Sequence, residues 1–112
     1  MSLPLDILTA PEFDRDVKKL SKKYRRIGED IRALMHEFEA LGIHGELMIG
    51  YDREVRKVRL TNRSANRGKS GGFRALNVVE DEFAIRLIRL YSKTEESSVS
   101  RAVIRRTLRF LS

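Results

Sequence analysis

The spacing of apolar positions along this chain of 112 residues changes several times, and each change marks a different kind of element. A short apolar run at residues 5–8 predicts a first strand. Apolar side chains then recur at three- and four-residue intervals, the period of an amphipathic helix. The first such stripe is Phe13, Val17, Leu20 and Tyr24, and the second is Ile31, Leu34, Met35, Phe38 and Leu41. Two helices joined by a break at residues 26–28 are therefore expected.

Local signals predict where these helices begin and end. Thr9 and Glu12 have the spacing of a capping box, in which each side chain satisfies a backbone N–H group near the other. Pro11 fits the first helical turn, where a missing N–H group has no consequence. Gly42 follows the second stripe and is placed to close that helix with a positive φ. We expect a loop from there to Gly50.

From residue 55 the apolar period falls to two, which predicts a strand. Val58 and Leu60 then face the helices, and Lys57 and Arg59 face the other way. A Gly-, Ser- and Asn-rich connection follows this strand.

Two further strands are predicted at residues 73–79 and 83–91, and a last amphipathic helix is predicted to end at Leu111. Ser97 or Ser98 is expected to cap that helix at its N-terminus, because a serine side chain accepts a hydrogen bond from a free helical N–H group.

The element order β-α-α-β-β-β-α predicts a single α+β domain over residues 1–112. In this fold a helical hairpin packs on a small, mostly antiparallel sheet, with the helices on one face. The opposite face is then partly open and carries Lys57, Arg59 and residues near Arg74.

Composition excludes several classes of site. The chain has no cysteine, and its two histidines, His36 and His44, have no cysteine or paired carboxylates beside them, so neither a metal site nor a cofactor is expected. No apolar run approaches the ~18 residues that cross a membrane. The N-terminus lacks the features of a signal peptide. We therefore expect a cytoplasmic protein without a membrane partner.

The net charge of +7 is concentrated in residues 55–76. This segment contains seven of the 23 basic residues and no Asp or Glu, and the remainder of the chain is balanced. A neutral body with one basic segment predicts a polyanionic partner, of which nucleic acid is the commonest.

Three motifs then point to a known family. They are R-K-V-R at residues 56–59, G-K-S-G-G-F-R at residues 68–74 and Y-S-K-T-E at residues 91–95. Together with the element order, they make the chain resemble the RelE/ParE superfamily of toxins, with the HigB-like branch nearest. The resemblance implies a RelE-like fold and a type II toxin that a cognate antitoxin neutralises.

The resemblance also implies the activity and the partners. RelE members are metal-independent endoribonucleases that cut translated mRNA in the ribosomal A site, whereas ParE members share the fold and inhibit DNA gyrase. The implied partners are the antitoxin, the ribosome and mRNA, with an operator DNA contacted only through the antitoxin complex.

Metal-free RNA cleavage requires removal of the 2′-OH proton, stabilisation of charge on the phosphorane and protonation of the 5′-oxygen. The resemblance places Arg74 at the scissile phosphate, which its planar guanidinium can grip through two oxygens. Lys57 and Arg59 match the family's paired cations, and a lysine packed among cations can act as a base. Tyr91 and Lys93 are candidates for orienting the base or donating the proton.

Arg63, Arg67 and Lys69 are expected to form a mobile rim that attracts RNA, and Arg56 is a further expected RNA-binding residue. The chain departs from the family at two positions. Thr94 and Ser100 stand where the best-known RelE members carry an arginine and a tyrosine, so those two roles are vacant or reassigned.

Each of these residues also has a structural alternative. Lys57 and Arg59 can be a solvated strand face, Arg74 can be paired to a carboxylate, and Tyr91 can be a core aromatic. For the whole chain, the alternatives to a nuclease are a ParE-like gyrase inhibitor and a non-catalytic module that binds nucleic acid.

Overall fold

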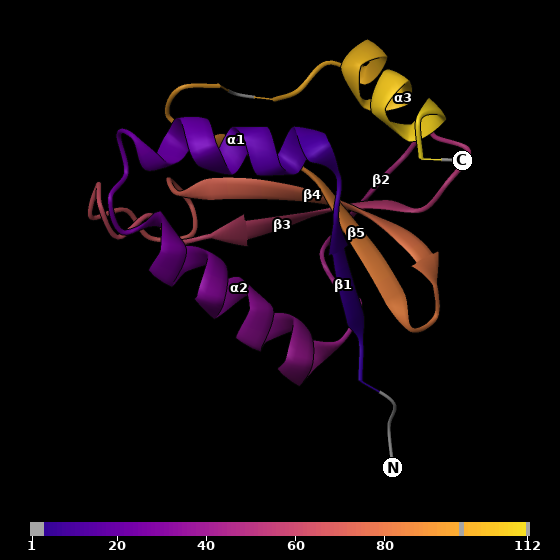
Figure 1. Ribbon diagram of the computed structural model, residues 1–112, viewed down its shortest axis with the longest axis horizontal. Coiled ribbons are helices and arrows are strands. Elements are labelled where there is room, and N and C mark those ends of the chain that lie inside the picture. Colours follow the sequence, from indigo (N-terminus) through magenta and orange to yellow (C-terminus); the bar gives the residue numbers. More distant parts are fainter. Residues whose placement is uncertain (1–3, 97, 112) are drawn as a thin grey trace.

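The computed structural model describes residues 4–96 and 98–111, which form an α+β domain with three helices and a five-stranded mixed sheet (Figure 1). The elements in chain order are β1 (Asp6–Thr9), α1 (Pro11–Ser21), α2 (Ile27–Leu41), β2 (Glu46–Met48), β3 (Val55–Leu60), β4 (Phe73–Asp81), β5 (Ala84–Ser92) and α3 (Arg101–Arg109). The strand order is β1-β5-β4-β3-β2, in which β1 is parallel to β5 and the other neighbours are antiparallel.

The strand β2 corrects the expected element order, because it lies in the segment predicted to be a loop. Its three residues pair with β3, so that Glu46 stands opposite Lys57 and Met48 stands opposite Val55. Three residues are too few to show a period along the sequence. The pairing with β3 therefore defines this strand, and the short apolar pattern could not have revealed it.

One face of the sheet is covered by α1 and α2, as the two apolar stripes predict. Phe13, Leu34 and Phe38 of these helices pack in one cluster with Val58 and Leu60 of β3, which confirms the predicted direction of both strand residues. Burial of a large apolar side chain contributes roughly 1.5–3 kcal/mol. This layer therefore supplies much of the stability of the domain.

The other face carries α3, so the expectation that all helices lie on one face is wrong. Ile104 and Leu108 of this helix pack against Val55, Val78 and Ile88 of the sheet. Figure 1 shows α3 beside the connection between β2 and β3. An amphipathic helix needs an apolar surface on which to pack, but its sequence does not specify which face of the sheet provides it. The second face is open only beyond the area that α3 covers.

The start of α1 differs from the predicted capping box. Ala10 is the N-cap residue, and no side chain caps the helix there. Glu12 instead lies 3.4 Å from Arg15, and the backbone N–H of Ala10 donates to the carbonyl of Leu87 at 2.8 Å. The start of α1 is thus positioned by the docking of Ala10 on β5 and not by a side-chain cap, while Pro11 occupies the first turn as predicted.

The C-terminus of α2 and the N-terminus of α3 are each closed by a single residue. Gly42 ends α2 with φ of +70°, which confirms the prediction. At α3 the cap is Ser100, whose hydroxyl accepts a hydrogen bond from the N–H of Val103 at 3.2 Å. The expected cap Ser98 is therefore wrong by two residues, and Ser97 lies outside the described residues.

Candidate anion site on the open sheet face

Three of the predicted site residues form one row across the sheet. Arg59 of β3 stands opposite Arg74 of β4, and Arg74 stands opposite Tyr91 of β5. Directly opposed residues point to the same face, with Cβ atoms roughly 4.5–5.5 Å apart. The row lies on the face that carries α3, where Arg59 is exposed and Arg74 and Tyr91 are buried. Residues 15 to 32 positions apart in the chain therefore meet at one place.

Arg74 is buried, with 5% of its surface exposed. Its Nη1 atom donates to the carbonyl oxygens of Lys69 at 2.8 Å and Phe73 at 3.2 Å, and its Nη2 atom donates to that of Ser70 at 3.0 Å. No carboxylate lies within 4 Å of it in the described part of the chain. The alternative of an arginine paired to a carboxylate is therefore not what the structure shows.

Burial lowers the pKa of Arg74, and the neighbouring Arg59 lowers it further. Both effects disfavour the charged form, because the guanidinium loses contact with water and meets a like charge. Arg59 is exposed and has no carboxylate partner among the described residues. Glu46 acts on Arg74 from a greater distance and raises its pKa, but the two adjacent cations have no carboxylate within 4 Å in the described chain. Such a pair favours an anion beside it, and a phosphate fits the planar fork of the exposed Arg59.

The sequence left open whether Tyr91 is a core aromatic or a member of the site, and the structure shows a buried tyrosine that also stands in the row. Its side chain is buried in the cluster beneath α3, with Ile104 and Leu108. Burial raises the pKa of Tyr91, and the positive charge of Arg74 acts in the opposite direction. The phenol is therefore protonated at neutral pH and stands in the same row as the two arginines. It can donate a proton only to a group that reaches the row.

Lys57 lies on the same face as Arg59 but beside a carboxylate. Its Nζ atom is 3.4 Å from Oε2 of Glu46, which stands opposite it on β2. The prediction of Lys57 as a base assumed that it is packed among cations. The ion pair shows that a carboxylate lies beside it instead. Lys93 follows β5, where its N–H donates to the carbonyl of Gly72 at 2.9 Å and its side chain is exposed.

Several of the residues expected to bind RNA are held by ion pairs with carboxylates. Arg56 lies 2.6 Å from Glu54, and Lys69 lies 2.8 Å from Glu37. Arg67 has no carboxylate partner within the described ranges.

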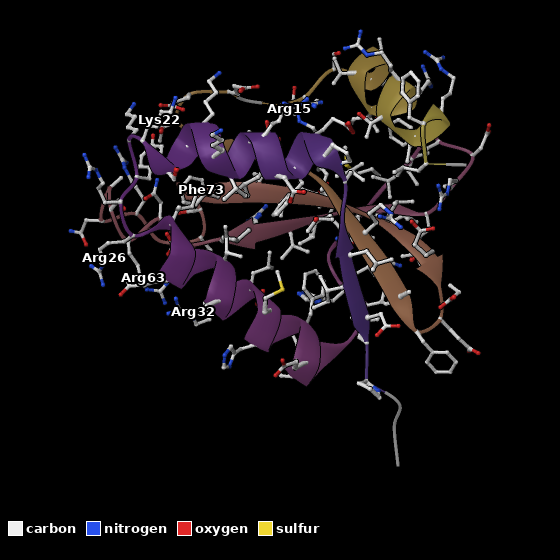
Figure 2. All side chains as sticks on the ribbon, viewed as in Figure 1. Arg15, Lys22, Arg26, Arg32, Arg63 and Phe73 are labelled. Carbon is white, nitrogen blue, oxygen red and sulfur yellow. The ribbon has the colours of Figure 1, made fainter. Side chains whose placement is uncertain are left out.

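Arg63 is anchored most firmly, because it contacts the buried carboxylate of Asp30 at 2.6 Å. Figure 2 shows Arg63 beside the start of α2, with Arg26 and Arg32 close by. The backbone N–H of Arg26 also donates to the hydroxyl of Ser64 at 2.7 Å. The β3–β4 connection is thus attached to α2 and does not extend freely from the sheet.

These contacts change the electrostatic picture that the sequence suggested. Four of the seven basic residues in the segment are paired with carboxylates, and three are left without one in the described chain: Arg59, Arg67 and Arg74. The uncompensated charge of the segment is therefore centred on the row and its adjoining loop.

The sequence did not reveal a cleft at the edge of β3, beyond the end of β2. It has a volume of about 390 Å³, and three groups that the motifs did not indicate line it: Glu37, His44 and Glu46. Lys57, Arg59 and Lys69 line its other side. The cleft therefore adds titratable groups next to the predicted cations.

His44 is the least satisfied group in this cleft. Its Nδ1 atom lies 2.8 Å from the carbonyl oxygen of Gly42, and its buried Nε2 atom has no hydrogen-bond partner. Oε2 of Glu37 is 3.5 Å away. Burial raises the pKa of Glu37, but the hydrogen bond from Lys69 and the proximity of His44 outweigh it, so the net pKa is lowered. A histidine in a loop gives no signal of such a contact.

The two departures from the family pattern have local structural roles. The hydroxyl of Thr94 lies 3.0 Å from that of Ser92, and Ser100 caps α3. Neither side chain extends the row of Arg59, Arg74 and Tyr91.

No group of three or more His, Cys, Asp or Glu side chains within residues 4–96 and 98–111 has the geometry of a metal site. No helix in these ranges is long and apolar enough to cross a bilayer. No known protein-family model matches the chain, and no curated protein sequence does so.

Proposed function

We propose that this chain is the toxin of a type II toxin–antitoxin system, a metal-independent endoribonuclease that cuts mRNA on the ribosome. The observation that carries this proposal is the row of Arg59, Arg74 and Tyr91. It combines two cations without a carboxylate within 4 Å and a neutral phenol, which can supply charge stabilisation and a proton donor for phosphodiester cleavage without a metal. The three motifs of the RelE-like resemblance support the same reading.

In the proposed reaction the 2′-oxygen of one nucleotide attacks the adjacent phosphorus, and the bond to the 5′-oxygen breaks. Arg74 and Arg59 stabilise the negative charge that gathers on the phosphorane oxygens. Tyr91 donates its proton to the departing 5′-oxygen. Glu46 accepts the proton of the 2′-OH group, because its carboxylate lines the adjoining cleft together with Arg59, and Lys57 holds this carboxylate in place through their ion pair.

The partners in this proposal are the translating ribosome and its mRNA in the cytoplasm, together with a cognate antitoxin. The antitoxin would contact an operator DNA and bring the toxin to it. A small DNA-binding protein encoded in the adjacent reading frame is the expected source of that antitoxin.

Induced expression followed by mapping of mRNA 5′ ends tests the activity. We expect the parent chain to produce new ends within translated frames. Arg59→Gln and Arg74→Lys should reduce cutting by about a hundredfold, the effect of removing one donor to a developing anion. Lys22→Gln removes an exposed cation that follows α1 on the opposite side of the sheet and is the matched control. Full cutting by folded Arg59→Gln and Arg74→Lys variants would refute the assignment.

A non-catalytic RNA-binding module is the second candidate, because Tyr91 is 3% exposed and the two family positions at residues 94 and 100 carry other residues. This candidate predicts salt-dependent RNA binding without new mRNA ends. A gyrase inhibitor would instead arrest DNA replication while translation continues, so pulse labelling of DNA and protein separates it from both.

A further inference from the structure

The helix α3 concentrates positive charge outside the basic segment. It carries four arginines and no acidic residue: Arg101, Arg105, Arg106 and Arg109. All four are exposed, and none has a carboxylate within 4 Å in the described part of the chain. A helix that only needed a solvated outer face would gain from pairing such charges with acidic residues one turn away. The absence of these pairs makes α3 a candidate surface for an anion.

Two clefts lie on different sides of this helix. One, of about 490 Å³, lies between α3 and the connection from β2 to β3, and it is lined by Tyr51, Asp52, Arg53, Arg105, Leu108 and Arg109. The other, of about 390 Å³, lies between α3 and α1, and Arg106 lines it beside two ion pairs, Arg15 with Glu12 and Arg89 with Asp16. The arginines of α3 therefore line two separate clefts.

The first cleft combines cations with an aromatic ring. Arg105 lies over Tyr51, with Cζ 5.7 Å from the ring centroid, and its Nη2 atom donates to the carbonyl of Gly50 at 3.1 Å. These contacts hold the guanidinium at the cleft without neutralising it. Arg53 contributes less, because it pairs with Glu80 at 2.8 Å. Arg105 and Arg109 outnumber Asp52, the single carboxylate in the lining.

We propose that this cleft is a second RNA subsite that binds one nucleotide unit. Arg105 and Arg109 hold its phosphate, and the part of the Tyr51 ring that lines the cleft contacts its base, while the rest of the ring packs against the cluster beneath α3. Cations that follow the backbone together with aromatic side chains that contact bases are the combination by which proteins bind single-stranded RNA without a sequence preference. The inference rests on the proposed function in one respect, that the ligand is RNA.

The position of the cleft suits a strand that also occupies the row. α3 covers the sheet face at Val55, and Arg59 lies four residues further along β3 on the same face. Four residues of strand span about 13 Å, and the cleft lies further on, at the connection that precedes Val55. An RNA of several nucleotides that extends past α3 contacts both places, so the subsite would increase affinity and fix the direction of the strand.

Fluorescence anisotropy with a labelled 12-nucleotide RNA, whose 2′-O-methyl riboses prevent cleavage, tests this subsite. Arg105→Gln should weaken binding about tenfold and lower the slope of log K against log salt by about 0.7, the change for one phosphate contact on a single strand. Arg106→Gln is the matched control, with the same charge change on the same helix, and should alter affinity less than twofold. Equal effects of the two substitutions would overturn the subsite.

Tyr51→Leu should weaken binding at least fivefold, the lower range for a lost base contact, and leave the salt slope unchanged. An unchanged affinity would overturn the contact with the base. Polyglutamate that displaces RNA from the parent and from Tyr51→Leu equally well would overturn the nucleotide assignment in favour of an acidic protein partner.

Arg59→Gln separates this inference from the proposed function. Weaker binding in Arg105→Gln with normal binding in Arg59→Gln would support the subsite and contradict the assignment of the row. The reverse pattern would support the row and overturn the subsite.

Discussion

The row of two opposed arginines makes a prediction that links stability to function. Arg59→Gln removes a positive charge that faces Arg74 across the β3–β4 pair. Two unit charges about 6 Å apart repel by about 0.7 kcal/mol in a water-like dielectric. Like charges at directly opposed strand positions destabilise a sheet by an energy of the same order. We therefore expect the variant to be more stable than the parent by about 0.5 kcal/mol at low salt.

An anion bound at the row should make the parent more stable than Arg59→Gln. Phosphate at ten times its dissociation constant stabilises a protein that binds it by about 1.4 kcal/mol. The parent should gain this stability, and Arg59→Gln should gain much less, because half of the paired charge is missing. In the absence of phosphate, the higher stability of Arg59→Gln relative to the parent comes from relieved repulsion. This difference should therefore shrink at 1 M salt, where the Debye length falls to about 3 Å.

Urea denaturation followed by far-UV circular dichroism measures both effects. Each protein is unfolded in sodium chloride and in sodium phosphate at equal ionic strength, so that screening is matched. Arg67→Gln is the control, since Arg67 also has no carboxylate partner in the described chain but lies in the β3–β4 connection. A destabilised Arg59→Gln, or equal stabilisation of parent and variant by phosphate, would refute the reasoning.

Three further predictions concern the carboxylates around the site. Asp30→Asn should destabilise the fold by about 2 kcal/mol in urea denaturation, because it weakens the hydrogen bonds that this buried carboxylate accepts from Arg63 and Thr61. Glu37→Gln should release Lys69 and increase amide hydrogen exchange at residues 67–72, whereas unchanged exchange would dismiss this anchor. Burial raises the pKa of Glu80, but two arginines outweigh it and the net pKa is below 4.5. The stability from Glu80 is therefore present above that pH and lost as pH falls through the lowered pKa. Glu80→Gln should flatten the acid side of the stability profile.

The parts of the fold that follow from periodicity could be predicted from the sequence. The stripes of α1 and α2, the direction of Val58 and Leu60, and the end of α2 at Gly42 all depend on near neighbours in the chain. The strand β2 could not be predicted, because three residues show no period and its pairing with β3 defines it. The face that α3 covers could not be predicted either, because an amphipathic helix can pack on either face of a sheet.

The candidate site, like the fold, could be predicted from the sequence only in part. The sequence indicated Arg59, Arg74 and Tyr91 through their motifs, and the strand register brings them together. It could not reveal that carboxylates far along the chain neutralise much of the basic segment. The pair of Glu37 and Lys69 joins residues 32 positions apart, and charge counted along the sequence contains no information on such distances.

The attachment of the β3–β4 connection to α2 has a consequence for kinetics. Arg63 and Ser64 contact α2, and Asn62 pairs with Arg67 through two backbone hydrogen bonds of 2.8 Å. A connection held in this way loses little conformational freedom when a ligand arrives. Association should then be limited by electrostatic encounter, with an on-rate that falls steeply with salt. Differences among RNA sequences should appear in the dissociation rate, which stopped-flow measurements can resolve.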